Sequence, residues 1–196
     1  MLEVTNVQVY NLREAVIAAR NPMRTVPAQH TDEEFEASLQ RCVKLIRHGG
    51  GSGHTNFRTG IVVSFDVRYP QYWSMEAQRY HFFQIVSSSS KMHSLAKLDI
   101  RRSCNEYVTE QSIAQLEQLA RAYNDHPTEE RLMTMLSNCP MGLELFMHIT
   151  TNYEQLATIY KQRKTHRLRD WHVFCHFIEQ LPYAQELICV ERENPE

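Results

Sequence analysis

Apolar residues near the start of the chain first alternate with polar ones and then recur at helical spacing. The stretch 4–10, VTNVQVY, alternates well enough to predict a strand, and 12–20, LREAVIAAR, has the spacing of a helix that ends near Asn21-Pro22. Thr31 is then placed to cap a second helix with acidic residues in its first turn. The apolar stripe of that helix consists of Phe35, Leu39, Val43 and Ile46. The fold therefore opens with a strand and two helices.

A β-branched run follows the glycine-rich segment that ends the second helix. The stretch from Gly60 to Arg68, GIVVSFDVR, predicts a central strand, which the Tyr69-Pro70 step closes. From Gln71 to Val86 the chain is apolar and aromatic without a breaker, which predicts a helix. This helix is expected to deliver a polar loop, Ser87 to Ser90.

The second half of the chain is read as helical. Helices are predicted over 110–123, over 128–136 after Pro127, over 143–160 after Pro140, and over 168–180 before Leu181-Pro182. The class predicted is α+β, with strands first and a helical second half. We expect a single domain over residues 1–190, followed by an acidic tail at 191–196 that is frayed.

Composition restricts the class of protein further. With 42% hydrophobic and 22% charged residues, the chain is an ordinary globular protein of one-domain length. A net charge of −2 predicts no general affinity for nucleic acid, so an anionic ligand needs a local basic cluster such as 163–169.

Cysteine usage and hydropathy predict a cytoplasmic protein. The five cysteines form no C-x-x-C pair, which indicates reduced thiols. Cys175 shares a predicted helix face with His172 and His176, but the second half of a zinc site is missing, so no metal is predicted. No stretch approaches the roughly 20 apolar residues of a membrane span, and residues 1–10 lack a signal-peptide core.

Two neighbouring segments carry candidate binding groups. Glu76 and Arg79 are three residues apart, so on a helix they either hold a polar ligand together or form a surface ion pair. The serines before Lys91 offer hydroxyl and N–H donors suited to a phosphate, or else form a flexible connector. No G-x-S-x-G elbow surrounds them and no His–Asp partnership is assignable, so a serine nucleophile is not favoured.

Two further segments each have one interpretation as a ligand-binding site and one as a purely structural feature. The run GGGSGHT at 49–55 lacks a Walker lysine, and its glycines either admit a ligand beside His54 or end a helix. Asn152 and Arg163 are eleven residues apart, close to three helical turns, so both side chains are able to face one ligand. The alternative for Arg163 is a solvated, basic helix end.

The order of these segments is more specific than any one of them. Gly53-His54-Thr55 leads into the predicted strand, and Pro70, Glu76, the triplet Arg79-Tyr80-His81 and Ser89 follow at set offsets. Farther on come Pro140, Thr150-Thr151-Asn152 and Arg163. In this order the chain resembles the flavin-dependent thymidylate synthases from about Gly53 to Arg163.

The resemblance implies a fold, an assembly and a reaction. It implies an α+β domain with a mainly antiparallel sheet, in a homotetramer that binds FAD and dUMP at subunit junctions. The implied flavin contacts are His54, Thr55, Arg79, His81 and Asn152, and the implied nucleotide contacts are Glu76, Ser87, Ser88, Ser89, Lys91 and Arg163. Of these, Ser89 and Arg163 are the implied catalytic residues. The implied reaction moves a one-carbon unit from methylenetetrahydrofolate to C5 of dUMP, with hydride from FAD reduced by NADPH.

The chain departs from the family at several of these positions. His81 stands where the family has arginine, Lys91-Met92 where it has Arg-Tyr, and Glu76 where it has glutamine. Leu136 occupies a position where a nucleotide-binding arginine is expected. A carboxylate at position 76 suits a ligand with an extra amino or hydroxyl donor. The alternatives are therefore a pyrimidine nucleotide hydroxymethylase, an enzyme acting on a cytosine nucleotide, or an inert nucleotide-binding homologue.

Overall fold

The computed structural model describes residues 2–48 and 52–190. These residues form two compact units. Unit 1 comprises 2–5, 66–81 and 85–149, and unit 2 comprises 6–48, 52–65, 82–84 and 150–190. The predicted acidic tail and glycines 49–51 lie outside the described residues.

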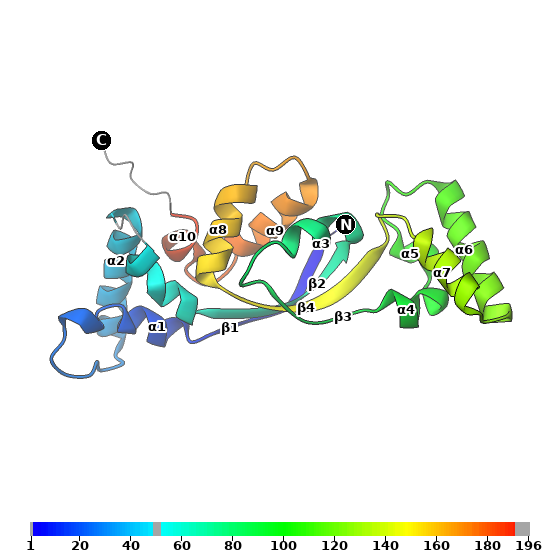
Figure 1. The fold of residues 1–196 in the computed structure, drawn as a ribbon. Coiled ribbons are helices and arrows are strands. Elements are labelled where there is room, and N and C mark those ends of the chain that lie inside the picture. Colours follow the sequence, from blue (N-terminus) through cyan, green and yellow to red (C-terminus); the bar gives the residue numbers. More distant parts are fainter. Residues whose placement is uncertain (1, 49–51, 191–196) are drawn as a thin grey trace. The chain divides into compact units, whose positions relative to one another are not determined.

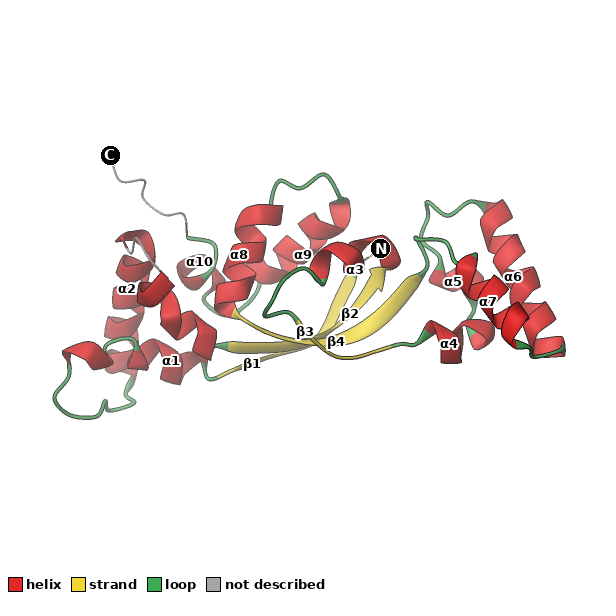
Figure 2. Cartoon of the chain, viewed as in Figure 1, coloured by secondary structure: helices red, strands yellow, loops and turns green. Residues whose placement is uncertain are grey.

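Four strands form one antiparallel sheet (Figures 1 and 2). The strands are β1 (Glu3–Tyr10), β2 (Val62–Pro70), β3 (Gln84–Ser88) and β4 (Glu144–Asn152), in the order β1-β2-β4-β3. Every strand contributes residues to both units. The predicted strands at 4–10 and 60–68 correspond to β1 and β2, and β2 is central as expected. The fold class is α+β, as the sequence predicts.

Unit 2 contains the helices from both ends of the chain. They are α1 (Leu12–Ala18), α2 (Asp32–His48), α8 (Tyr153–Arg163), α9 (Arg169–Glu179) and α10 (Ala184–Leu187), with 3-10 helices η1 (Asn21–Met23) and η2 (Ser52–Gly60). The predicted cap of α2 is present, because the Glu34 N–H donates to Thr31 Oγ1 at 3.2 Å. The buried stripe of α2 contains Phe35, Leu39, Cys42 and Ile46, so Cys42 takes the place expected for Val43.

Aromatic rings form the centre of unit 2. Phe65 on β2 lies 5.9 Å from Phe174 and 5.1 Å from Phe177, both on α9, measured between ring centroids. Phe83 lies 5.9 Å from Phe174 as well. The ring of Phe65 is tilted by 54° against Phe174 and by 57° against Phe177, and this close aromatic packing fixes α9 against β2.

Unit 1 contains one helix before β3 and a helical region after it. Its helices are α3 (Gln71–Ala77), α4 (Lys91–Ser94), α5 (Ile100–Ser103), α6 (Glu110–Asp125) and α7 (Glu129–Ser137), with the 3-10 helix η3 (Leu95–Lys97). Helices α6 and α7 lie side by side in Figure 1. Thr109 and Thr128 cap them, each accepting a backbone N–H at 3.3 Å. Both helices were predicted from the sequence.

The helix predicted over 143–160 is wrong. The structure has β4 there, followed by α8. In β4, Leu145, Met147 and Ile149 are buried, whereas Phe146 and His148 point outward. This period of two belongs to a strand, and pairing within the sheet overrides the helical reading. The expected order of strands first and helices after is also wrong, because β4 follows α7.

The single helix predicted over 71–86 is wrong as well. Helix α3 ends at Ala77, a turn follows, and β3 begins at Gln84. Phe83 is buried in the aromatic cluster of unit 2, and the β-branched residues Ile85 and Val86 suit an extended chain. The serines therefore lie on and after an edge strand, not in a loop delivered by a helix.

None of the helices within residues 2–48 and 52–190 has the length and apolarity required of a membrane span.

Candidate functional site

The serine segment lines a cavity in unit 1. The Ser89 N–H donates to the Phe146 carbonyl at 2.9 Å, and the Phe146 N–H donates back to Ser89 Oγ at 3.2 Å. These bonds pair the residue that follows β3 with β4. Ser87, Ser88 and Ser89 line a cavity of about 410 Å³ together with Phe146 and His148. The backbone of Ser89 is thus held at the edge of a cavity that all three serines line.

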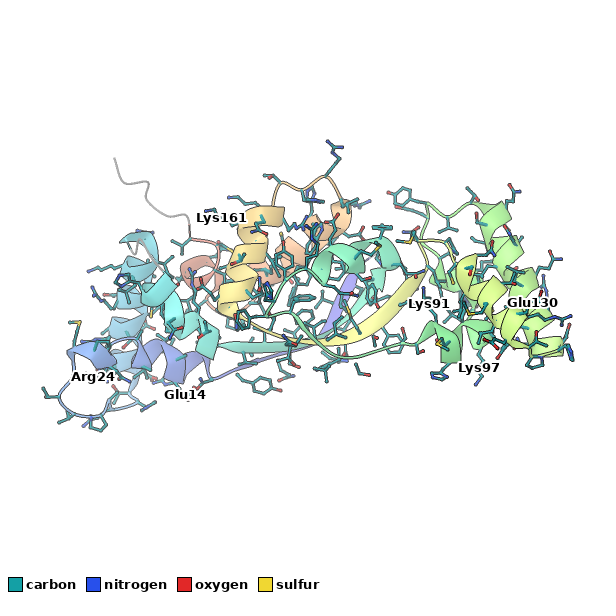
Figure 3. All side chains as sticks on the ribbon, in the orientation of Figure 1. Glu14, Arg24, Lys91, Lys97, Glu130 and Lys161 are labelled. Atoms are coloured by element: carbon teal, nitrogen blue, oxygen red, sulfur yellow. The ribbon has the colours of Figure 1, made fainter. Side chains whose placement is uncertain are left out.

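Lys91 is held by α3. It is the first residue of α4, and its Nζ donates to Gln71 Oε1 at 2.6 Å (labelled in Figure 3). Gln71 in turn donates from Nε2 to the Pro140 carbonyl at 2.9 Å. Lys91 does not line the serine cavity. The two bonds fix its ammonium group against Gln71, at the start of α3.

The predicted pair of Glu76 and Arg79 lies at the end of α3. Glu76 is half-buried within the helix, whereas Arg79 is exposed in the turn that follows. The Arg79 N–H donates to the Glu76 carbonyl at 3.3 Å, so the two residues are joined through the last helical turn. His81 is exposed two residues farther on. The turn therefore presents a guanidinium and an imidazole to solvent.

His54 and Thr55 lie in η2 of unit 2. His54 is exposed and Thr55 is buried. Arg58, in the same 3-10 helix, is 4% exposed and lies 3.4 Å from the Glu154 carboxylate at the start of α8. This ion pair joins η2 to α8, so the histidine is displayed from an anchored segment.

Asn152 caps α8. Its Oδ1 accepts the Gln155 N–H at 2.9 Å. Gln155 Oε1 accepts the Phe82 N–H at 3.2 Å, and Thr151 Oγ1 donates to the Phe82 carbonyl at 2.6 Å. The Thr-Thr-Asn segment therefore connects β4, α8 and the chain before β3 within unit 2.

We expect Asn152→Ala to lower the free energy of unfolding by about 1 kcal/mol, because the Gln155 N–H loses its acceptor. Urea denaturation measures this loss. Asn152→Ser keeps a capping oxygen and is expected to stay near the wild-type value. Equal stability of the alanine variant and the wild type would contradict a capping role.

Arg163 ends α8, and its guanidinium lies 4.6 Å from the centre of the Trp171 ring. Stacking on an indole fixes the plane of the guanidinium. Because a helix rises by roughly 1.5 Å per residue, Asn152 and Arg163 sit at opposite ends of α8, on the order of 16 Å apart along its axis. A ligand that contacts both residues must therefore span most of the length of α8.

The cysteines are free thiols with little nucleophilic character. Burial raises the pKa of Cys42 to about 12, and burial followed by the nearby Glu179 carboxylate raises the pKa of Cys175 to about 12. Burial also raises the pKa of Cys104, Cys139 and Cys189. Because the thiolate is the reactive form, cysteine nucleophiles are disfavoured at neutral pH.

The residues considered for zinc have other partners. His172 Nε2 is 2.6 Å from the His166 carbonyl, and His176 Nδ1 is 3.3 Å from Glu179. In the described part of the chain, no three His, Cys, Asp or Glu side chains gather as a possible metal site.

Sequence reasoning missed Asp66 and His148. The two side chains line the serine cavity from β2 and β4, with Asp66 Oδ1 2.6 Å from His148 Nδ1. Both are partly exposed, at 38% of each side chain. The outward alternation of Phe146 and His148 was the signal available in the sequence, but it becomes useful only once 144–152 is read as a strand.

The antiparallel sheet and its helices are shared with solved structures of a flavin-dependent thymidylate synthase, with which the chain aligns over almost its whole length. The flavin-dependent thymidylate synthase ThyX from Helicobacter pylori, complexed with FAD and dUMP, superimposes with a TM-score of 0.74 over 94% of this chain and 97% of that chain, at 14% identity. A second crystal structure of the same enzyme with FAD and dUMP gives a TM-score of 0.71 over 96% and 97%, at 16% identity.

Comparisons of the sequence alone identify no relative. No protein-family model matches the chain, and no curated protein matches it. At 14–16% identity, the similarity to ThyX establishes a shared fold.

Proposed function

We propose that the chain is a flavin-dependent enzyme that transfers a one-carbon unit from methylenetetrahydrofolate to C5 of dUMP, with hydride from FAD reduced by NADPH. The observation that carries the proposal is the fold shared over 94% of the chain with ThyX bound to FAD and dUMP. The spacing of the sequence motifs supports it independently, because their order matches the same family. We also propose the homotetramer that the resemblance implies.

The exposed donors fit a flavin dinucleotide. The Arg79 guanidinium is exposed and always charged, which suits the flavin diphosphate, and His81 and His54 present exposed imidazoles. When bound, FAD supplies the hydride. In our proposal Thr55 and Asn152 also contact the flavin, with Asn152 capping α8 as well.

The serine segment and Lys91 suit the phosphate of the nucleotide. Ser87 and Ser88 offer exposed hydroxyls, and Ser89 is fixed by its bonds to Phe146. Lys91 adds a compact positive charge, which Gln71 holds in place. In our proposal these groups bind the phosphate, and Arg163 stabilises negative charge that develops on the pyrimidine ring.

Glu76 favours a second candidate, an enzyme for a cytosine nucleotide or a hydroxymethylase. The carboxylate is half-buried at the family's glutamine position. A carboxylate accepts hydrogen bonds but does not donate them, so it suits the amino group of cytosine better than the carbonyl of uracil.

A visible absorbance spectrum of the purified protein, after free flavin has been removed, tests the proposal. We expect a retained flavin band that dUMP perturbs and dCMP does not. Arg79→Ala should lose the flavin, whereas Arg102→Ala, which removes an exposed guanidinium of the same unit, should retain it. Perturbation by dCMP alone would favour the cytosine enzyme. A protein that binds no flavin would be the inert homologue.

A further inference from the structure

A short basic segment joins α8 to α9 in unit 2, visible as the loop between these helices in Figure 1. It runs from Lys164 to Arg169, and its exposed cations are Lys164, Arg167 and Arg169. No acidic residue occurs between Glu154 and Asp170, and Asp170 itself is only 7% exposed. Because the whole chain has a net charge of −2, this segment, which we call the basic connector, is a local concentration of positive charge.

The backbone of the basic connector is held by hydrogen bonds to both helices. The Lys164 N–H donates to the Tyr160 carbonyl at 3.0 Å, at the end of α8. From α9, Nε2 of His172 donates to the His166 carbonyl at 2.6 Å, and the Leu168 N–H donates to His166 Nδ1 at 3.2 Å. The cations therefore extend from a fixed backbone, so little of it has to be ordered when a ligand binds.

Helix electrostatics account for only one of the three exposed cations. A helix favours positive charge at its C-terminus and disfavours it at its N-terminus, because its dipole is positive there. Lys164 directly follows α8, where a cation is favourable. Arg169 is the first residue of α9 and Arg167 lies two residues before it, so both lie at the positive end of that dipole. Two arginines at a position that destabilises the helix indicate a role in binding negative charge.

The placement of the cations suits a flexible chain of carboxylates. They extend from the end of α8 to the start of α9, so they match several separate negative charges better than one compact anion. The guanidinium groups have the planar geometry that pairs with carboxylates. Single-stranded nucleic acid is also held by exposed aromatic rings on which bases stack, whereas Trp171, the indole that Arg163 contacts, has no exposed surface. A short polycarboxylate is the better fit.

We propose that the basic connector binds the γ-linked glutamate chain of the folate co-substrate. Each glutamate added to this chain contributes one more carboxylate. The inference rests on the proposed function, in which the folate transfers its one-carbon unit to a pyrimidine ring that Arg163 contacts. Arg163 ends α8 and the basic connector follows it directly, so the cations come next to the place where the folate reacts. The enzyme thereby selects folates with several glutamates over the monoglutamate.

Isothermal titration calorimetry of the protein with FAD and dUMP tests this assignment. The ligands are 5-formyltetrahydrofolates, stable analogues of the co-substrate, that carry either one glutamate or five. We expect the pentaglutamate to bind about tenfold more tightly, because several exposed ion pairs each add a modest factor. Since salt screens such pairs, the preference should shrink as the ionic strength rises.

The double variant Arg167→Gln/Arg169→Gln should reduce this preference to within about twofold and leave the affinity for the monoglutamate unchanged. Arg41→Gln/Arg47→Gln is the matched control, because it removes the same charge from exposed positions on α2 of the same unit, and it should keep the preference. We also expect the first variant to unfold at a higher urea concentration than the wild type, since its arginines oppose the dipole of α9.

The outcomes separate this inference from the proposed function. Equal affinity for the two folates in a protein that retains flavin would overturn the inference and leave the proposed function intact. An unchanged preference in the Arg167→Gln/Arg169→Gln variant, a lower urea midpoint of that variant, or displacement of the pentaglutamate by an equal concentration of oligothymidylate would overturn it as well. A protein that binds neither flavin nor either folate would overturn both.

Discussion

Phe174→Ala is expected to lower the free energy of unfolding by about 3–5 kcal/mol, the range for truncating a fully buried phenylalanine. The side chain has no exposed surface and lies at the centre of the aromatic cluster of unit 2. Its ring centroid is 5.4 Å from that of Phe177, 5.8 Å from Trp171 and 5.9 Å from Phe65. Truncation leaves a cavity between β2 and α9. Because these two elements are held in place by the rest of unit 2, they cannot move together to fill it.

Urea denaturation followed by circular dichroism measures this loss. Phe82→Ala is the matched control, because Phe82 belongs to the same unit but is 63% exposed, and a change within about 0.5 kcal/mol is expected for it. If both variants lost the same stability, burial in the cluster would not be the cause. Phe174→Leu should fall between alanine and the wild type, because it keeps much of the apolar volume.

The elements that the sequence predicted are those whose signals are local. Helices α6 and α7 combine amphipathic spacing with capping threonines at 109 and 128, and β2 has a β-branched run closed by Pro70. Each signal lies within a few residues of the element it defines. Packing with distant parts of the chain is not needed to recognise such segments.

The sequence of β4 carries a strand pattern and a helix pattern at the same time. Its buried residues alternate with outward ones, but the run LELFMHITT contains enough apolar residues to read as a helix too. Only the neighbouring strands β2 and β3 decide between the two, because they supply hydrogen-bond partners to an extended chain.

Strand β3 had almost no signal. It is an edge strand whose five residues are all exposed, so burial imposes no alternation on QIVSS. Its pairing is fixed by the bonds between Ser89 and Phe146, which are 57 residues apart in sequence. A contact of this range is invisible to any local pattern.

The residues of the candidate site also divide into those recognised from the local sequence and those recognised only from the structure. Ser87, Ser88 and Ser89 were recognised because hydroxyl groups are clustered in sequence, and the structure brings them to one cavity. Asp66 and His148 are 82 residues apart, and they meet only through the register of β2 and β4. Acid–base pairs that form across strands therefore require the sheet before they are recognised.

Arg163→Ala is expected to lower kcat/KM for dUMP about 10²-fold, under the proposed function. Removing a single donor that stabilises charge developing in the transition state typically has an effect of this size. The stacking of the guanidinium on Trp171 at 4.6 Å fixes the group before the ligand arrives, so little reorganisation is needed. The measurement is steady-state turnover together with equilibrium binding of dUMP.

Two further variants separate the charge of Arg163 from its packing. Lys161→Ala removes an exposed cation from the same helix (labelled in Figure 3) and is expected to leave turnover unchanged. Arg163→Lys keeps the charge but loses the planar surface that stacks on Trp171, so it should recover only part of the activity. Near wild-type turnover by Arg163→Ala would remove Arg163 from the reaction and leave its contact with Trp171 as a means of holding the end of α8 against α9.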